Sequence, residues 1–373
     1  MNIWMSSCIL HRMLPAMCPA AGLKHRSFSG IGVGTMNEAI FDIPEQLNAS
    51  TPIELTGKNR DEVKLMVLNR KTGTCLHSRF DQLQAQLKKG DVLVVNNSRT
   101  IPASLKGKQG NRQVEVRLSR KVSSGEWDTL ILGSMYDTRL PISFGDGVNA
   151  VMAGKGSEEP LLRLAFNVEG EAFYDFIYRK GQPVRYEYIA TPWPLDKYQT
   201  VYGSVPGSVE MASAGRAFSW KLISRLRAEG VEMATLQLHA GLSYYGDDRW
   251  PTPKNHPEEY HLPQETVDSI RKAKKNGNRV IAVGTTVVRA LETVAAEHDG
   301  ELAAASGVTN LYITKESPLH VVDGLITGLH EPQASHLDLL RAFVSDEHLF
   351  RAYRNALAKS YMWHEFGDMN LIL

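Results

Sequence analysis

The chain is poor in cysteine and has no excess of charge of either sign. Its 373 residues include three cysteines, Cys8, Cys18 and Cys75, whose spacing matches neither a disulfide framework nor a paired metal site. So few cysteines are typical of a reducing compartment, and we expect a cytoplasmic protein. Because the net charge at pH 7 is +1, binding to a nucleic acid would depend on a local basic patch.

Several motifs that would identify common activities are also absent. The sequence contains no Walker loop, no dinucleotide-binding GxGxxG, no HExxH zinc motif and no GxSxG nucleophile elbow. Its apolar runs are short and interrupted, so we expect no membrane segment. These absences argue against a P-loop enzyme, a zinc protease and a serine hydrolase, and we expect no metal.

The first 35 residues contain no aspartate or glutamate and differ from the rest of the chain. Basic, acid-free leaders that contain serine are typical of organellar transit peptides. Met36, however, opens a stretch that looks like a natural start. Residues 1–35 are therefore either a targeting peptide, an extension from a wrongly assigned start, or a disordered tail, and we expect them to be disordered or not translated.

Two hydrophobic patterns divide the remaining chain. Residues 36–102 and 186–373 alternate buried strands, such as 92–95, with amphipathic helices, such as 219–231. Residues 103–185 instead hold short strands of alternating polar and apolar residues between glycine-rich turns, a pattern typical of a small antiparallel barrel or sandwich. We therefore predict an α/β fold, a sheet flanked by helices, interrupted by a smaller antiparallel β-barrel-like domain.

The second half of the chain predicts strands and helices in turn. The expected strands cover 232–241, 279–284, 308–314 and 323–330, and the expected helices cover 263–277, 285–298, 336–344 and 350–361. A short amphipathic helix is also expected to begin at Phe80.

The best local signal of a site lies in residues 279–293. A buried strand ends there at Gly284, and a helix begins with Thr285 and Thr286. The first turn of a helix has unpaired N–H groups, and ligands of α/β sheets bind beyond the carboxyl ends of strands. A structural explanation is also open, because threonine is a common N-cap and glycine a common turn residue.

Clustered ionisable residues mark further candidates. We expect residues 255–263 to form a loop that carries His256 and Glu258, which can act as an acid–base pair. Exposed loop charges without a role are the alternative. His330 follows a predicted strand, and Asp368 lies in an aromatic-rich C-terminus that is otherwise explained as a docked terminal strand.

Residues 198–208, YQTVYGSVPGS, contain two Gly-Ser pairs. Because glycine lacks a Cβ, these pairs permit either a flexible connection or a close approach of the backbone to a ligand. Residues 271–279, RKAKKNGNR, form a local basic patch. Such a patch fits contact with phosphates, but it is equally common on a solvated helix face.

Taken in order, the motifs of residues 41–373 resemble one family. The segments are FDIPEQL, NRDEVKLMVLNRKTG, LKKGDVLVVNNSRTIPASL, YQTVYGSVPGSV, LQLHAGL, HPEEY, RVIAVGTTVVRALET, VVDGLITGLHEP and FGDMNLI. They are similar to segments of the S-adenosylmethionine:tRNA ribosyltransferase-isomerases of queuosine biosynthesis. Each segment is weak alone, and their shared order carries the resemblance.

The resemblance implies a fold and a reaction. The family's fold is an α/β domain interrupted by a smaller β-barrel-like domain. Its members transfer the ribosyl group of S-adenosylmethionine to 7-aminomethyl-7-deazaguanine in tRNA and isomerise it to epoxyqueuosine, with release of adenine and methionine. S-adenosylmethionine is thus expected as a co-substrate and tRNA as a partner, with no metal and no stable protein partner.

The resemblance also implies a set of cleft residues at matching motif positions. The expected catalytic residues are His256, Glu258 and His330, with His256 and Glu258 as the first choice for proton transfer. The expected substrate-binding residues are Tyr198, Gln199, Gly207, Ser208, Thr285, Thr286, Arg289 and Asp368.

The sequence departs from the family's pattern near the expected site. Where the family reads GSVAAPTAGLHFT, this chain reads GSVEMASAGRAFSW, which adds the acid Glu210 and replaces a Leu-His pair by Arg216-Ala217. LHVGLGTF becomes LHAGLSYY, and FFSYGDAML becomes WHEFGDMNL. Because a lost polar partner in a buried site is costly, three outcomes stay open: an active queuosine enzyme, a divergent paralogue with another acceptor, or a non-catalytic RNA- or nucleotide-binding protein.

Overall fold

The computed structural model describes residues 41–133, 136–247, 249–332 and 334–373. The predictions for residues 1–35 lie outside these ranges. Residues 40–373 form one compact unit by their contacts. Within the described ranges, no helix is long and apolar enough to cross a membrane.

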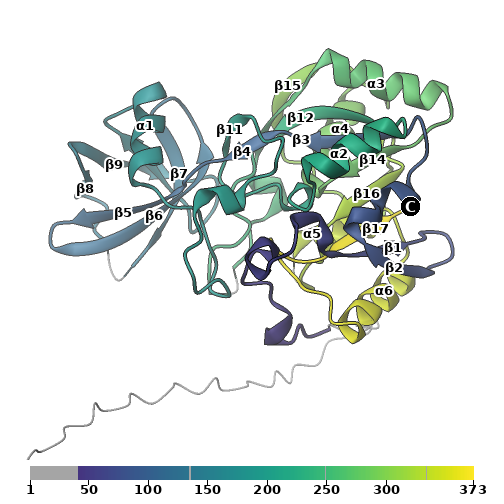
Figure 1. The fold of residues 1–373 in the computed structure, drawn as a ribbon. Helices are drawn as coiled ribbons and strands as arrows, with labels where there is room; N and C mark the ends of the chain where they lie inside the picture. Colours follow the sequence, from purple (N-terminus) through teal and green to yellow (C-terminus); the bar gives the residue numbers. More distant parts are fainter. Residues whose placement is uncertain (1–40, 134–135, 248, 333) are drawn as a thin grey trace, which may run out of the picture. The chain divides into compact units, whose positions relative to one another are not determined.

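Nine strands of the described chain form one mixed sheet in the order β15-β13-β12-β3-β14-β16-β17-β1-β2 (Figure 1). Strands β12, β3, β14 and β16 run parallel to one another, while β13 and β17 run against them. The strands are β1 Lys64–Leu68, β2 Cys75–Arg79, β3 Val92–Asn96, β12 Glu232–Leu238, β13 Glu258–Leu262, β14 Val280–Val283, β15 Ala305–Thr309, β16 Gly324–Thr327 and β17 Met369–Ile372.

Helices cover both faces of this sheet, so its central strands are apolar on both sides. One face packs against α3 Gln264–Lys275, α4 Thr285–Glu297, α5 Ser335–Leu340 and α6 Asp346–Ala358. The other face packs against α2 Trp220–Ala228 and a 3-10 helix, Phe80–Gln86. Successive residues of β3 alternate between these two cores, with Val92 and Val94 in the first and Leu93 and Val95 in the second.

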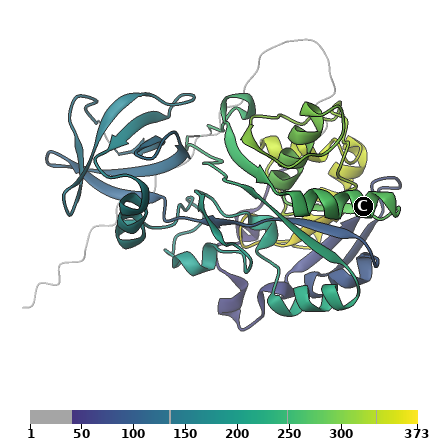
Figure 2. The ribbon, with the colours of Figure 1, turned by 90° about the horizontal axis from the view of Figure 1, so that it is seen from above.

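Six strands of the described chain between Ser104 and Phe166 close into a barrel (Figures 1 and 2). They are β5 Ser104–Gln109, β6 Arg112–Lys121, β7 Glu126–Leu132, β8 Ile142–Gly145, β9 Val148–Lys155 and β10 Leu162–Phe166. Helix α1, Gly170–Lys180, contributes Phe173, Phe176 and Ile177 to the barrel's core. The predicted fold class, a helix-flanked sheet with a smaller antiparallel barrel, is confirmed.

The chain enters and leaves the barrel at neighbouring positions. Ser104 and Gln182 exchange both backbone hydrogen bonds, each 2.9 Å between N and O. Such a pairing fits an insertion into another domain, because the two ends of an inserted segment must meet. We propose on this basis that residues 103–185 are a domain inserted between residues 36–102 and 186–373.

Some local predictions were wrong. The segment 255–263 is not only a loop, because Glu258–Leu262 forms β13 between β12 and β15. The strand expected at 308–314 instead covers Ala305–Thr309, after which the chain leaves the sheet. Part of the Gly-Ser stretch is a short strand, β11 Val205–Ser208, which pairs with β4 Ser98–Thr100.

Candidate active site

A cavity of about 430 Å³ lies at the carboxyl edge of the parallel strands. The segments that follow β12, β14 and β16 line it with residues 240–244, 284–286 and 327–331. Strand β13 runs antiparallel to β12, so its first residue, Glu258, lies at the same edge. Strand β17 runs antiparallel to β16, so the segment before β17 lies there as well. This edge is where α/β sheets bind their ligands.

The turn from β14 to α4 forms one part of the wall. Gly284 adopts a φ of 99°, which favours glycine, and a Cβ there would lie 3.4 Å from the Ala214 Cβ. Thr285 and Thr286 then begin α4 without a side-chain cap, so the helix starts at the cavity. The Asn96 amide at the end of β3 donates to the Thr286 hydroxyl over 3.4 Å.

Glu258 and Arg289 form a buried ion pair on the cavity wall. Glu258 is 6% exposed; its Oε2 pairs with the Arg289 guanidinium, and its Oε1 accepts from the Gly241 backbone N–H at 3.1 Å. Arg289 also donates from Nε to the Leu311 carbonyl at 3.1 Å. With both oxygens engaged, the Glu258 side chain is held in one orientation.

His256 lies beside this pair and is 6% exposed. Its Nδ1 is 3.2 Å from the Tyr245 hydroxyl, and a Cβ on Gly241 would come within 2.4 Å of its Nε2. Burial lowers the pKa of His256, although the Glu258 carboxylate opposes this shift. The imidazole is therefore neutral at pH 7 and is able to accept a proton.

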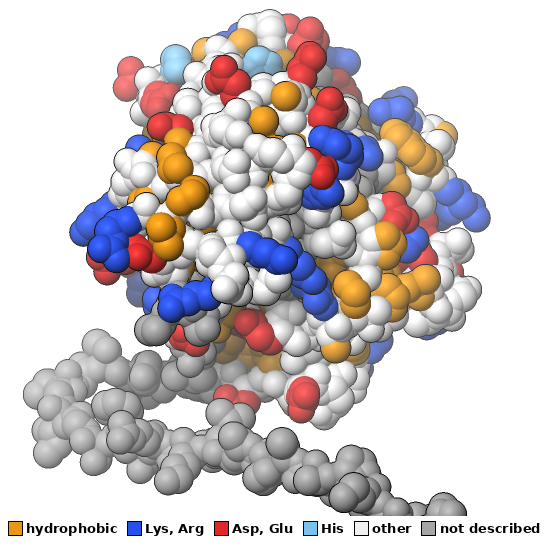
Figure 3. Space-filling model, turned by 90° about the vertical axis from the view of Figure 1, so that its left-hand side faces the viewer, with side chains coloured by type: hydrophobic (Ala, Val, Ile, Leu, Met, Phe, Trp, Pro, Cys, Tyr) orange, Lys and Arg blue, Asp and Glu red, His pale blue; other side chains and the backbone are white. Residues whose placement is uncertain are grey.

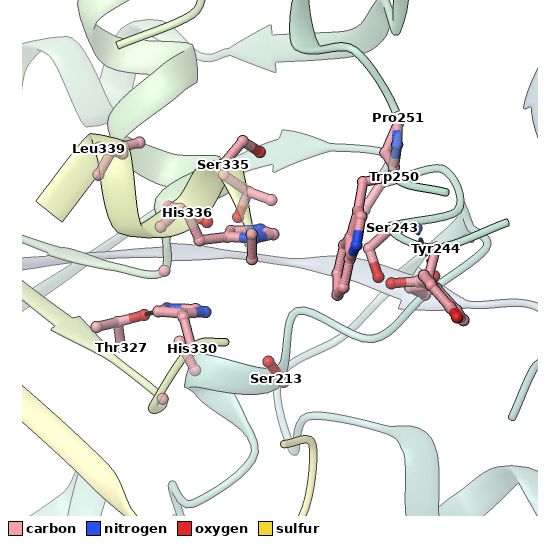
Figure 4. Close-up of a pocket in the computed structure, with 18 of the residues that line it drawn as sticks. Ser213, Ser243, Tyr244, Trp250, Pro251, Thr327, His330, Ser335, His336 and Leu339 are labelled. Carbon is pink, nitrogen blue, oxygen red and sulfur yellow. Dashed lines mark hydrogen bonds between the residues drawn. The ribbon is translucent and has the colours of Figure 1, made fainter. Parts of the chain in front are cut away.

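Two more histidines line the cavity, and Figure 4 shows their rings one above the other. The His330 and His336 ring centroids are 4.8 Å apart with an interplanar angle of 6°, and the His330 Nε2 lies 2.6 Å from the Thr327 Oγ1. Burial lowers the pKa of His336 to about 4, and burial with the neighbouring imidazoles of His336 and His364 holds the pKa of His330 well below its ordinary value. Both rings are neutral at pH 7.

Two carboxyl groups on the wall are bonded to tyrosines instead of to basic side chains. The Tyr186 hydroxyl donates to Glu210, and the Tyr188 hydroxyl donates to Glu365. Glu210 also accepts from the Ser243 backbone N–H at 2.7 Å. Burial raises the pKa of Glu210 to about 7, and Glu365 adds to the rise, so this carboxyl group titrates near neutral pH.

Six of the predicted site residues line this one cavity although they lie far apart in the sequence: His256, Glu258, Thr285, Thr286, Arg289 and His330. The position after a parallel strand or at the start of an antiparallel one explains each of them. Their roles toward a substrate stay predictions.

The other predicted site residues lie outside the cavity wall and hold the backbone around it. The Gln199 amide bonds both backbone groups of Thr100 at 3.1 and 2.8 Å, and the Ser208 hydroxyl accepts from the Ala240 N–H at 2.9 Å. At Gly207 a Cβ would come within 2.6 Å of the His239 ring. The close approach that glycine permits here is therefore to another part of the protein.

Tyr198 and Asp368 have similar supporting places. Tyr198 is buried and its ring packs against Phe366 at a centroid distance of 5.3 Å. The Asp368 oxygens accept from the Lys64 and Met362 N–H groups at 2.6 and 2.7 Å, which joins β1 to the segment before β17. Contact of these two side chains with a substrate stays a prediction.

Sequence reasoning missed several residues of the wall. Tyr186, Tyr188 and Trp250 belong to no motif, and His336 was predicted only as the start of the expected helix 336–344. Glu210 is a departure from the family's pattern that was not among the predicted site residues. A signal was available for His336, because it lies in the first turn of α5, which follows β16 at the carboxyl edge.

The departures from the family's pattern separate into two groups in space. Glu210, Ser213, Tyr244 and Glu365 line the cavity. Arg216 does not, because its guanidinium pairs with Glu54 and lies 4.8 Å from the Phe366 ring centroid. Ala217, at the position of the missing histidine, is buried in the core between α2 and the sheet.

The basic patch at 271–279 lies at the other edge of the sheet. It joins the end of α3 to Val280, which begins β14, whereas the cavity lies beyond the end of β14. Lys272, Lys274 and Arg279 pair with acidic side chains there. Within the ranges that the structure describes, no group of three or more potential metal ligands was found.

Comparison with known proteins gives the same family for nearly the whole chain. The family model of the queuosine biosynthesis proteins matches residues 36–372. The crystal structure of an S-adenosylmethionine tRNA ribosyltransferase from Thermotoga maritima is similar, with 30% sequence identity and a TM-score of 0.51, over 89% of this chain and 99% of that chain. Matches of this extent show that the chain belongs to the queuosine biosynthesis protein family.

Proposed function

We propose that this protein is an S-adenosylmethionine-dependent tRNA ribosyltransferase-isomerase that forms epoxyqueuosine in tRNA. The observation that carries the proposal is the match of residues 36–372 to the queuosine biosynthesis family, which spans the segments of the carboxyl-edge cavity. The similar crystal structure is that of an S-adenosylmethionine tRNA ribosyltransferase. S-adenosylmethionine is the co-substrate and the deazaguanine base of tRNA is the acceptor.

The cavity contains groups suited to such a reaction. A proton must leave the carbon beside the sulfonium, and departing adenine must gain one. The neutral imidazole of His256 is our candidate for accepting the first proton, with Glu258 and Arg289 fixing the wall beside it. The second candidate set is His330 with His336, whose neutral rings also line the cavity.

The tRNA would be held outside the cavity, because its wall has little positive charge. Arg289 is engaged by Glu258, and the basic patch at 271–279 lies at the opposite edge of the sheet. The face of the molecule that includes the barrel carries lysine and arginine side chains scattered among acidic and apolar ones (Figure 3). We propose that dispersed contacts of this kind hold the phosphates. We also propose that the protein acts in the cytoplasm.

A divergent paralogue with another acceptor is the second candidate. It is favoured by one observation, that Glu210, Ser213, Tyr244 and Glu365 line the cavity at positions where the sequence departs from the family's pattern. The side chains that contact a substrate determine the specificity of an enzyme. Substitutions at the cavity wall therefore change which acceptor is used more readily than substitutions in the core do.

The experiment is a product analysis with the full chain. The protein is incubated with S-adenosylmethionine and tRNA that carries 7-aminomethyl-7-deazaguanine, and digested tRNA is examined for epoxyqueuosine by mass spectrometry. We expect the product together with equal amounts of adenine and methionine, and none with tRNA that carries guanine at the same position. Adenine release without epoxyqueuosine would favour another acceptor, and S-adenosylmethionine binding without release would favour a non-catalytic role.

A further inference from the structure

The charges on the cavity wall are unbalanced. Among the described residues, five glutamates and one arginine line the cavity, and no lysine does. The arginine is Arg289, which Glu258 already engages. Burial also lowers the pKa of each lining histidine, so none of them offsets the acidic charge at pH 7. A wall of this composition attracts cationic groups and repels phosphates.

Two of these glutamates are Glu210 and Glu365, and Glu365 lies close enough to Glu210 to raise the cost of ionising it. In the described part of the chain, neither has a lysine or arginine within ion-pair distance, and each accepts a hydrogen bond from a tyrosine hydroxyl. A carboxylate that is removed from water without a cationic partner is costly, so it gains from any cation that enters.

Aromatic rings surround these two carboxyl groups. The ring centroids of Tyr244 and Trp250 are 4.9 Å apart, those of Tyr186 and Tyr244 are 5.8 Å apart, and those of Tyr186 and Tyr188 are 6.4 Å apart. Figure 4 shows Tyr244 and Trp250 on the wall opposite to His330 and His336. We call the following six residues the acidic aromatic end of the cavity: Tyr186, Tyr188, Glu210, Tyr244, Trp250 and Glu365.

We propose that the acidic aromatic end binds an onium group of the substrate, either a sulfonium or a primary ammonium. Aromatic faces attract such cations, and a carboxylate beside them adds Coulomb attraction that a partly buried site screens poorly. The inference rests on the proposed function, in which S-adenosylmethionine supplies the sulfonium and the aminomethyl group of the acceptor base supplies the ammonium.

The site is a property of this chain and not of the family's motifs. Glu210 stands where the family's GSVAAPTAG has alanine, and Glu365 stands where FFSYGD has serine. Both acids converge on one end of one cavity although 155 positions separate them in the sequence (365 less 210). Two acids that meet at one place are expected if they recognise one cationic group.

Two pairs of ligands test the proposal by calorimetry at pH 8 with the full chain. S-adenosylmethionine and S-adenosylhomocysteine differ by the sulfonium, and 7-aminomethyl- and 7-cyano-7-deazaguanine differ by the ammonium. In at least one pair, we expect the member with the additional positive charge to bind about tenfold more tightly than the other member. Glu210→Gln and Glu365→Gln should each remove most of that preference, while the affinity of the member without the additional charge stays unchanged.

Glu187→Gln is the matched control, because Glu187 lies at the cavity between Tyr186 and Tyr188 but is exposed. It should keep the wild-type preference. Trp250→Leu is a further variant at the site. In each pair that responds, it should weaken binding of the ligand with the additional positive charge more than binding of the other ligand. Circular dichroism establishes that each variant is folded.

The pair that responds identifies the source of the cation, sulfonium or ammonium. A charge preference that is absent in the wild type, or that survives in all three site variants, would overturn the proposal. Failure of the proposed function gives a different result. The protein would then show the charge preference in calorimetry but form no epoxyqueuosine, so the onium site would stand without the reaction.

Discussion

Glu258 and Glu210 line the same cavity in contrasting surroundings. Glu258 accepts from the Arg289 guanidinium and the Gly241 N–H, which both favour its charged form. Glu210 accepts from the Tyr186 hydroxyl and the Ser243 N–H, and it has Glu365 nearby. One side of the cavity thus holds a fixed charge, and the other holds a carboxyl group whose charge depends on pH.

The difference bears on how the site could work. A carboxylate paired with arginine is a poor proton carrier, because the pair stabilises its charged form. On that side His256 is better suited to accept a proton. A carboxyl group with a pKa of about 7 is suited instead to respond to a cation that arrives, since the cation stabilises its ionised form.

The largest expected effect comes from breaking the fixed pair. Arg289→Met leaves Glu258 buried without its cation, and we expect a loss of about 3 kcal/mol of stability. The free energy of unfolding in urea measures it. The double variant Arg289→Met with Glu258→Gln removes both charges and should recover much of the loss. If the double variant were as unstable as the single one, packing and not charge would account for the effect.

Removal of the His256 imidazole, which lies beside the Glu258–Arg289 pair, should lower activity without unfolding the protein. His256→Ala is expected to slow adenine release in single turnover by about 100-fold, the usual contribution of a general base. His261→Ala is the control, because His261 lies five residues further along, on β13, but is exposed and bonds Ser306. An unchanged rate in His256→Ala would move the proton acceptor to His330 and His336.

The carboxyl group on the other side predicts a pH dependence of binding. Glu210 faces Tyr186, Tyr188, Tyr245 and Glu365, and its pKa is raised to about 7. Its ionised fraction therefore rises about tenfold from pH 6 to pH 8, and the affinity for S-adenosylmethionine should rise by a similar factor. Glu210→Gln should flatten this dependence in calorimetric titrations. A slope that persists in the variant would assign it to another group, such as Glu365.

The sequence predicted the fixed side of the cavity better than the titrating side. Thr285, Thr286, Arg289, His256 and Glu258 follow from strand ends and motif segments, because the ends of parallel strands meet at one edge. That logic does not depend on side-chain packing. The same is true of the fold, since the change from helix–strand alternation to short alternating strands marks the barrel.

The titrating side depends on contacts that no local pattern reveals. Tyr186 and Glu210 are 24 positions apart and Tyr188 and Glu365 are 177 apart, so their pairing follows only from the packed chain. The sequence also did not reveal that the side chains of Gln199 and Ser208 bond nearby backbone groups. A motif therefore identifies a segment near the site without telling which of its side chains face the ligand.

The smallest expected effect is on stability and concerns Glu210 alone. Its folded-state pKa of about 7 lies above the ordinary 4.5, so the protonated form stabilises the fold below about pH 4.5, and this contribution is lost as the pH rises through 7. Glu210→Gln cannot ionise and should be more stable than the wild type at pH 8, by about 1 kcal/mol because the cavity partly solvates the group. Thermal unfolding at pH 8 and pH 5 measures this margin, which should be much smaller at pH 5. An equal margin at both values would mean that Glu210 is not the carboxyl group that titrates near neutral pH.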